Sequence, residues 1–172
     1  MSESELLSFY RGVAPDCEGR RLVDILAWDD DRLERIHDYI QWLFPLPEAS
    51  RFNLNAPLLT PEDIKAFRSD SFLLNQVRGV LERLLTFLGL RLSKAGVSRG
   101  DQFSVLSRRW LQPLSHNHLR MTRIILFLRH IGLDQEASDF YACLLDISSH
   151  EGQFIIPLKT LSFWREAVTR AM

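Results

Sequence analysis

The sequence is poor in cysteine and in long apolar runs, and each scarcity excludes a class of protein. Cys17 and Cys143 are the only cysteines in 172 residues. They are too few and too far apart for a disulfide scaffold or a cysteine zinc site. No stretch of about 18 uninterrupted apolar residues is available to cross a bilayer. The first five residues carry two glutamates where a signal peptide would be basic and then apolar. We therefore expect a cytoplasmic protein with no bound metal and no membrane insertion.

The short motifs that mark many enzymes are also missing. There is no P-loop, no nucleophile elbow, no HExxH helix and no glycine-rich dinucleotide turn. His116 and His118 lie two residues apart, a spacing that does not bring both imidazoles onto one metal from a helix. We expect no catalytic residue and no cofactor. An enzyme that uses His116 or His37 as a general base remains an alternative.

The composition is that of a globular protein, with 46% hydrophobic and 25% charged residues, and its length suits one domain over residues 1–172. The net charge of −1 conceals an asymmetry. Residues 1–48 carry 11 acidic and 5 basic side chains, whereas residues 49–172 carry 11 acidic and 16 basic ones. Residues 78–129 hold ten arginines and lysines against Glu82 and Asp101. This excess could attract an acidic partner, or the two parts could neutralise each other in the fold, which is the interpretation we favour.

Apolar residues recur at helical spacing along most of the chain, and no segment combines strand-like alternation with a hairpin turn. The residues from 118 to 131 are apolar nearly all round, which is typical of a helix at the centre of a domain. The fold class is therefore all-α: an irregular single-domain bundle of about eight helices around a central apolar helix at about 118–131. The predicted helices cover residues 4–10, 21–28, 29–43, 60–68, 71–88, 103–111, 117–130, 133–147 and 157–170, and residues 96–100 are expected to form a mobile turn.

The polar segment 115–123 leads into the central helix and is the first candidate site. His116, Arg120 and Arg123 lie on one helical stripe, at positions i, i+4 and i+7. A guanidinium close to a core needs acceptors or must keep its head in water. The stripe, with Asn117 beside it, therefore either lines a cleft or is locked into a hydrogen-bonded network.

A second polar group comes from the helix that precedes Pro45. His37 and Gln41 are four residues apart on one face, and Trp42 and Glu48 follow them. Glu48, Asp38 or backbone carbonyls at the end of that helix could receive the arginines of the segment 115–123. One interpretation, which we favour, is a structural network that joins two helices and a loop. The other is a pocket for an anion or a peptide carboxylate, built on Arg120 and Arg123.

Two strings of residues carry a family resemblance. LExxHxYIQWLFPLxE from Leu33 to Glu48 and SHNxLRMTRI from Ser115 to Ile124 resemble the conserved region of the opioid growth factor receptor family. The resemblance extends over essentially the whole chain. It implies that residues 1–172 are one such domain and that the domain is a non-enzymatic module that binds a peptide or protein. Animal members of the family are described as receptors for an enkephalin pentapeptide, and no catalytic residue is established for the family.

The residues that match its strongest motifs are His37, Gln41, Trp42, His116, Asn117, Arg120 and Arg123. We expect these residues and Glu48 to form either a ligand site or the structural polar network. A peptide or protein with acidic groups is the expected partner. The sequence gives neither the ligand nor the oligomeric state.

Nucleic acid is not the expected partner, although a nucleic-acid-associated helical protein is a further alternative. Arg108 and Arg109 could flank phosphates together with Arg120 and Arg123. However, the helix that would have to enter the groove of a duplex is too apolar to leave the core.

Overall fold

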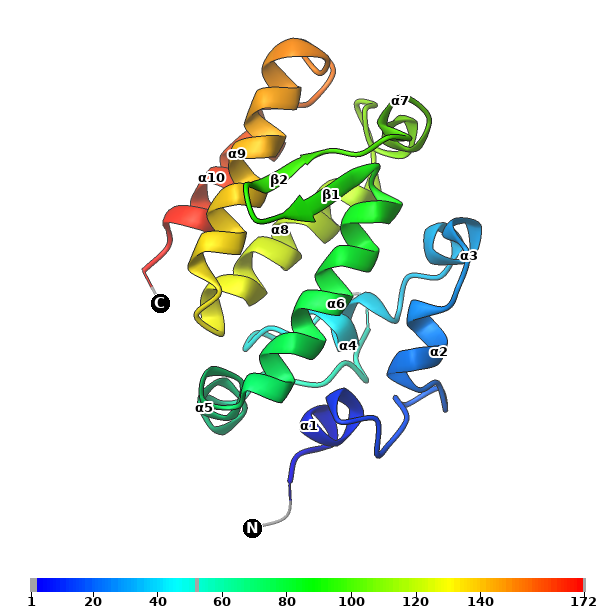
Figure 1. Ribbon diagram of the computed structural model, residues 1–172, viewed down its shortest axis with the longest axis vertical. Helices are drawn as coiled ribbons and strands as arrows, with labels where there is room; N and C mark the ends of the chain where they lie inside the picture. Colours follow the sequence, from blue (N-terminus) through cyan, green and yellow to red (C-terminus); the bar gives the residue numbers. More distant parts are fainter. Residues whose placement is uncertain (1–2, 52, 172) are drawn as a thin grey trace. The chain divides into compact units, whose positions relative to one another are not determined.

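The computed structural model describes residues 3–51 and 53–171, and within these ranges the chain forms ten α-helices and one β-hairpin (Figure 1). The all-α class predicted from the sequence is confirmed, with the small hairpin as an addition. The chain divides into two compact units, residues 1–83 and 84–172. The assignment of all 172 residues to one domain stays a prediction.

The first unit is built from short helices, and a longer helix leads out of it. Their bounds are α1 Glu5–Tyr10, α2 Leu22–Leu26, α3 Asp30–Arg35, α4 Ile40–Leu43, α5 Pro61–Ser69 and α6 Ser71–Phe87. The second unit begins with the last turn of α6. Its elements are β1 Leu90–Ser93, β2 Gly96–Arg99, α7 Phe103–Leu106, the 3-10 helix η1 Ser107–Arg109, α8 His116–His130, α9 Asp134–His150 and α10 Leu158–Thr169.

Local capping explains where several helices begin. The Asp29 side chain accepts a hydrogen bond from the Arg32 amide (2.7 Å) at the start of α3. At α5, Thr60 and Asp63 form a reciprocal capping box and Pro61 occupies the first helical position. Asp63 is 1% exposed and also accepts a hydrogen bond from Ser4 (2.5 Å), so the cap of α5 ties the start of α1 to it.

The predicted continuous helix over residues 29–43 is wrong, because the chain leaves the helix between α3 and α4. Ile36 is extended, with ψ of 136°. The break allows the Tyr39 hydroxyl to donate to the Leu33 carbonyl (2.9 Å), an oxygen that an uninterrupted helix would use for its own backbone ladder. It also buries the Tyr39 ring, whose centroid lies 5.5 Å from that of Trp28. Burial of a large aromatic side chain outweighs the loss of one helical turn.

The mobile turn predicted for residues 96–100 is also wrong, because Gly96–Arg99 form β2. The strands pair antiparallel with Leu90 opposite Arg99, and β2 packs on α9 (Figure 1). Arg99 holds this packing through ion pairs with Asp146 (2.6 Å) and Glu151 (2.7 Å) of the α9 segment. Four-residue strands are too short for alternation to stand out in the sequence, so the tertiary contacts with α9 decide this structure.

The predicted helix over residues 103–111 is interrupted after Leu106, where α7 ends. It ends in η1, and Trp110 leaves the helical path fully buried, with its indole N–H donating to the Leu88 carbonyl (2.9 Å). Buried indole groups take such a partner where the backbone offers one.

Helix α8 forms the core of the second unit, as its composition predicted, and packs against both α9 and α10. Met121, Ile124, Ile125, Phe127 and Leu128 are completely buried on it. The burial is not complete all round as predicted, because Leu119 is 54% exposed and Leu126 is half-buried.

On α10 the expected apolar face is only partly buried. Trp164 is 0% exposed, whereas Leu158, at the first position of the helix, is 84% exposed. Within the described residues, no helix is both long enough and apolar enough to span a bilayer.

Replacing Phe154 with glycine is expected to raise the free energy of unfolding by about 0.5–1 kcal/mol. Phe154 has φ of +66° in the turn before α10, and its side chain is 96% exposed, so glycine removes backbone strain without removing packing. Urea denaturation followed by circular dichroism measures the change. The neighbouring exposed Gln153, whose φ is not positive, is the control, and Gln153→Gly is expected to destabilise the protein. Equal effects of the two substitutions would contradict the prediction.

Candidate functional site

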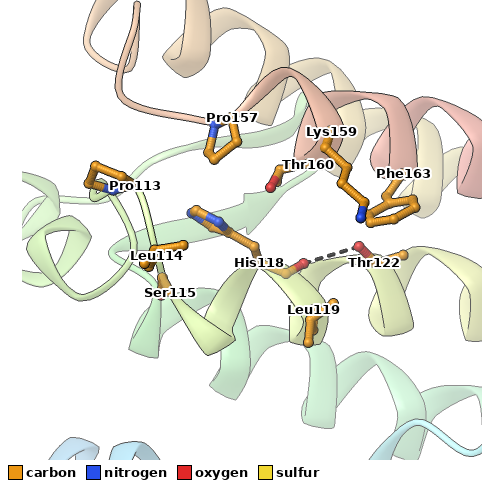
Figure 2. Close-up of a pocket in the computed structure, with 10 residues that line it drawn as sticks. All are labelled: Pro113, Leu114, Ser115, His118, Leu119, Thr122, Pro157, Lys159, Thr160 and Phe163. Carbon is orange, nitrogen blue, oxygen red and sulfur yellow. Dashed lines mark hydrogen bonds between the residues drawn. The ribbon is translucent and has the colours of Figure 1, made fainter.

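A groove runs between α8 and α10 in the second unit, and Figure 2 shows its first part. That part has a volume of about 240 Å³, and an adjoining part of about 470 Å³ shares Thr122 and Phe163 with it. We call the two together the α8–α10 groove. Helix α8 contributes His118, Leu119, Thr122 and Leu126, α10 contributes Lys159, Thr160, Phe163, Glu166, Ala167 and Thr169, and Arg170 follows directly after α10.

The lining follows from the helical period. Residues 115, 118, 119, 122 and 126 of the α8 segment lie on one stripe, as do residues 159, 163, 166 and 167 of α10 and residue 170 just after it. At 1.5 Å per residue, the stripe from Ser115 to Leu126 is about 16 Å long. An extended peptide rises about 3.3 Å per residue, so about five residues would fill the groove.

Exposed apolar side chains line this groove. Leu119 is 54% exposed, Phe163 is 39% exposed and Leu114, at one end, is 91% exposed. Single exposed apolar residues are ordinary, but several gathered at one concave surface indicate a binding site.

His118 forms part of the groove and is 6% exposed. Its Nε2 lies 2.7 Å from the Trp110 carbonyl oxygen, which can only accept, so Nε2 carries the proton. Burial lowers the pKa of His118, which leaves the imidazole neutral at pH 7. Its ring meets Trp164 edge-on with centroids 5.8 Å apart, and Figure 2 shows it directed toward the space between the two helices. The imidazole is therefore held in one orientation beside the groove.

Arg120 is part of a hydrogen-bonded network at the start of α8. It is 5% exposed, its Nη1 donates to Asn117 Oδ1 (3.1 Å), and its guanidinium carbon lies 5.9 Å from the centre of the Phe87 ring. Asn117 is 0% exposed and donates to the Arg109 carbonyl (3.5 Å), which also accepts from Ser115 Oγ (2.9 Å). These contacts join α8 to the segment before it.

The other predicted residues of this segment lie outside the α8–α10 groove. His116 is exposed on the first turn of α8 and Arg123 is half-buried. Neither they nor Arg120 line the groove.

The predicted residues of the first unit surround α4. Gln41 is 6% exposed and, in the orientation that satisfies its amide, donates to the carbonyls of His37 (3.3 Å) and Asp38 (3.0 Å). Trp42 is 2% exposed and its ring packs edge-on against Phe9 (5.3 Å between centroids). The Gln41 amide thus contacts the backbone of His37, whose side chain is exposed.

The predicted site therefore falls into two groups, one in each unit. Asn117 and Arg120 are in contact in the second unit, as His37 and Gln41 are in the first. Glu48 is exposed in the first unit, beyond the end of α4. The joining of the two groups into one network or one site stays a prediction.

Sequence reasoning missed Lys159, Phe163 and the exposure of Leu119. The signal for Lys159 was available, because it is one of only three lysines and stands at the start of an amphipathic helix. Leu119 and Phe163 gave no such signal, since exposed and buried apolar residues look alike in a sequence.

No metal centre or reactive thiol accompanies the groove in the described part of the chain. Among residues 3–51 and 53–171, no group of three histidine, cysteine or acidic side chains is placed to hold a metal ion. Cys143 is 7% exposed on α9, and burial raises the pKa of its thiol to about 11. It is therefore protonated at neutral pH and acts as a small apolar side chain.

Comparison with known proteins decides the family. The model of the opioid growth factor receptor (OGFr) conserved region matches residues 3–165. The chain belongs to this family. The opioid growth factor receptor of Rattus norvegicus is 38% identical over 135 residues, which cover 74% of this chain and 23% of the relative. That of Homo sapiens is 38% identical over 136 residues, which cover 74% of this chain and 20% of the relative.

A second branch of the family is also similar. The opioid growth factor receptor-like protein 1 of Mus musculus is 32% identical over 145 residues, covering 81% of this chain and 31% of the relative. The chain thus spans less than a third of the length of these relatives. No solved structure matches the chain.

Proposed function

We propose that this chain is a non-enzymatic module that binds a short peptide, or an exposed peptide segment of a protein, in the α8–α10 groove. Membership of a family whose relatives are named receptors for a growth factor supports a binding role. The observation that carries the proposal is the groove itself, with Leu119 and Phe163 partly exposed along it.

The shape and chemistry of the groove suit a peptide. Apolar surface on Leu119, Leu126 and Phe163 would bury peptide side chains, and His118 Nδ1, the unprotonated ring nitrogen, is the kind of group that accepts a backbone N–H. Each buried apolar side chain contributes about 1.5–3 kcal/mol before the entropic cost of ordering the peptide.

For Arg120 and Asn117 we propose a structural role. Arg120 is buried, bonded to Asn117 and stacked near Phe87 within its own unit, and it lies outside the groove. These contacts favour the structural network over a carboxylate pocket built on Arg120 and Arg123.

The alternative functions find less support. His37 and His116 are both exposed and line neither part of the groove, whereas a general base works within a cleft. Several arginines of the basic stretch are engaged by carboxylates of their own unit: Arg83 by Asp30 (2.8 Å), and Arg99 by Asp146 (2.6 Å). These charges are less available to a phosphate backbone.

Leu119→Ser is expected to weaken peptide binding about tenfold, because a partly exposed leucine would otherwise be covered by the peptide. The probe is a phage-displayed library of random seven-residue peptides selected on the full chain. Enriched peptides are then synthesised and measured by isothermal titration calorimetry.

The matched control is Leu145→Ser, because Leu145 is 37% exposed on α9 and lies outside the groove. It is expected to leave the affinity of the enriched peptides unchanged. Failure to enrich any peptide, or equal weakening by both substitutions, would refute the groove as the binding site.

A further inference from the structure

Lys159 stands out among the cations of the α8–α10 groove. Its ammonium nitrogen lies 5.6 Å from the centre of the Phe163 ring, one helical turn along α10. Figure 2 shows the lysine chain turned along α10 toward this ring, on the side of the groove where Thr122 of α8 lies. Within residues 3–51 and 53–171, the Lys159 ammonium makes no ion pair and no hydrogen bond. The contact with Phe163 therefore holds an uncompensated positive charge beside an apolar surface.

The ends of two helices add to this positive charge. Ser115 is the N-cap residue of α8 and Pro157 is that of α10, and both line the same end of the groove (Figure 2). The N-terminal end of a helix carries about half a positive charge. Pro157 offers no side-chain acceptor, so the first N–H groups of α10 have no side-chain cap. His118, between these ends, is neutral because burial lowers its pKa.

Little negative charge opposes Lys159 within the lining. Glu166 is the only acidic residue there, and its carboxylate accepts a hydrogen bond from Ser162 Oγ (2.7 Å) on its own helix. Arg170 supplies a second cation near the far end. The groove therefore presents apolar side chains with positive charge from the helix N-termini at the Ser115–Pro157 end and from the Lys159 ammonium beside Phe163, where the two parts of the groove meet.

We infer that Lys159 makes the groove selective for peptides that carry a carboxylate next to apolar side chains. The inference rests on the proposed function and specifies its ligand class. The apolar side chains of the peptide would cover Leu119 and Phe163, and the carboxylate, from an aspartate, a glutamate or the peptide C-terminus, would meet the Lys159 ammonium. This assigns recognition of acidic groups to Lys159 and not to the buried Arg120.

The test repeats the phage selection on the wild-type chain, on Lys159→Glu and on Lys94→Glu. Lys94 is exposed in the turn between β1 and β2 and lies outside the groove, so Lys94→Glu makes the same change of net charge elsewhere in the unit. Enriched wild-type peptides are also synthesised with amidated C-termini and with their acidic residues replaced by the corresponding amides. All affinities are measured by calorimetry at 50 mM and 500 mM salt.

We expect the wild-type chain and Lys94→Glu to enrich acidic peptides, and Lys159→Glu to enrich basic ones. Loss of the peptide carboxylates should weaken wild-type binding about three- to tenfold at low salt and much less at high salt, since the ammonium is exposed and screened. Comparing peptides that lose only side-chain carboxylates with peptides that lose only the terminal one identifies which of the two is read.

Two kinds of failure are distinguishable. The role of Lys159 would be overturned, with the binding groove left intact, by either of two results. In the first, the enriched peptides depend on Leu119 for binding but carry no excess of acidic residues. In the second, Lys159→Glu still enriches acidic peptides as the wild-type chain does. Absence of any enriched peptide, or binding that is insensitive to Leu119→Ser, would overturn both proposals.

Discussion

Trp164→Ala is expected to lower the free energy of unfolding by about 3–5 kcal/mol, the largest effect we predict. Trp164 is completely buried at the centre of α10. Its indole N–H donates to the His118 carbonyl (3.2 Å), and its ring meets the His118 imidazole at 88°. Alanine would leave a cavity and would remove the hydrogen bond to the His118 carbonyl and the ring contact with His118.

Trp164→Phe separates these contributions. It retains most of the ring but loses the N–H donor, so we expect a loss of about 1–2 kcal/mol. Urea denaturation followed by circular dichroism at 222 nm gives both values. A loss below about 1 kcal/mol for the alanine variant would show that Trp164 does not hold the two helices together.

The same substitution has a functional consequence. The α8–α10 groove exists because these helices pack side by side, and the buried Trp164 contacts His118, which lines it. A folded Trp164→Ala protein is therefore expected to bind the enriched peptides more weakly than Trp164→Phe. Calorimetry at a temperature where both variants remain folded makes the comparison.

Asp16→Ala is expected to destabilise the first unit by about 3 kcal/mol, through the loss of a buried ion pair. The Asp16 side chain is 0% exposed and pairs with Arg20 Nε at 2.7 Å. Its other oxygen accepts from the backbone N–H groups of Glu18 (3.0 Å) and Arg20 (2.8 Å). Alanine would leave the Glu18 and Arg20 amides without their acceptor. Among the described residues, the Arg20 guanidinium would keep only Asp38 as an ion-pair partner (2.8 Å).

Glu18→Ala is the matched control, because Glu18 lies in the same turn and its side chain is exposed. Its effect should stay within about 0.5 kcal/mol. Asp16→Asn retains the shape and one acceptor oxygen, and we expect an intermediate loss. Chemical denaturation of the three variants ranks them, and equal stability of Asp16→Ala and Glu18→Ala would refute the structural role of this pair.

Helix boundaries were predictable where local chemistry sets them. Thr60, Pro61 and Asp63 marked the start of α5 correctly, and Asp29 marked the start of α3. Such signals act over three or four residues, so they do not depend on distant contacts. The break after Arg35 could not be predicted, because the contacts of Tyr39 with Leu33 and Trp28 form only after the chain has folded back.

The candidate site was predictable only in part. Arg120 and Asn117 stood out as polar residues at the head of an apolar helix, and the structure joins them by a hydrogen bond. The groove beside them was not foreseen. Leu119 and Ile124 are both apolar residues on α8, yet one is 54% exposed and the other is 0% exposed.

The sequence by itself determined the helical class, the main helix starts and the family, because these depend on local patterns and on long specific strings of residues. Only the tertiary structure decided the hairpin, the breaks at residues 36–39 and 107–110, and the groove. The physical reason is that helical period sets which residues share a face. Whether that face is covered, and whether a charge such as that of Lys159 finds a partner there, depends on the element that packs against it.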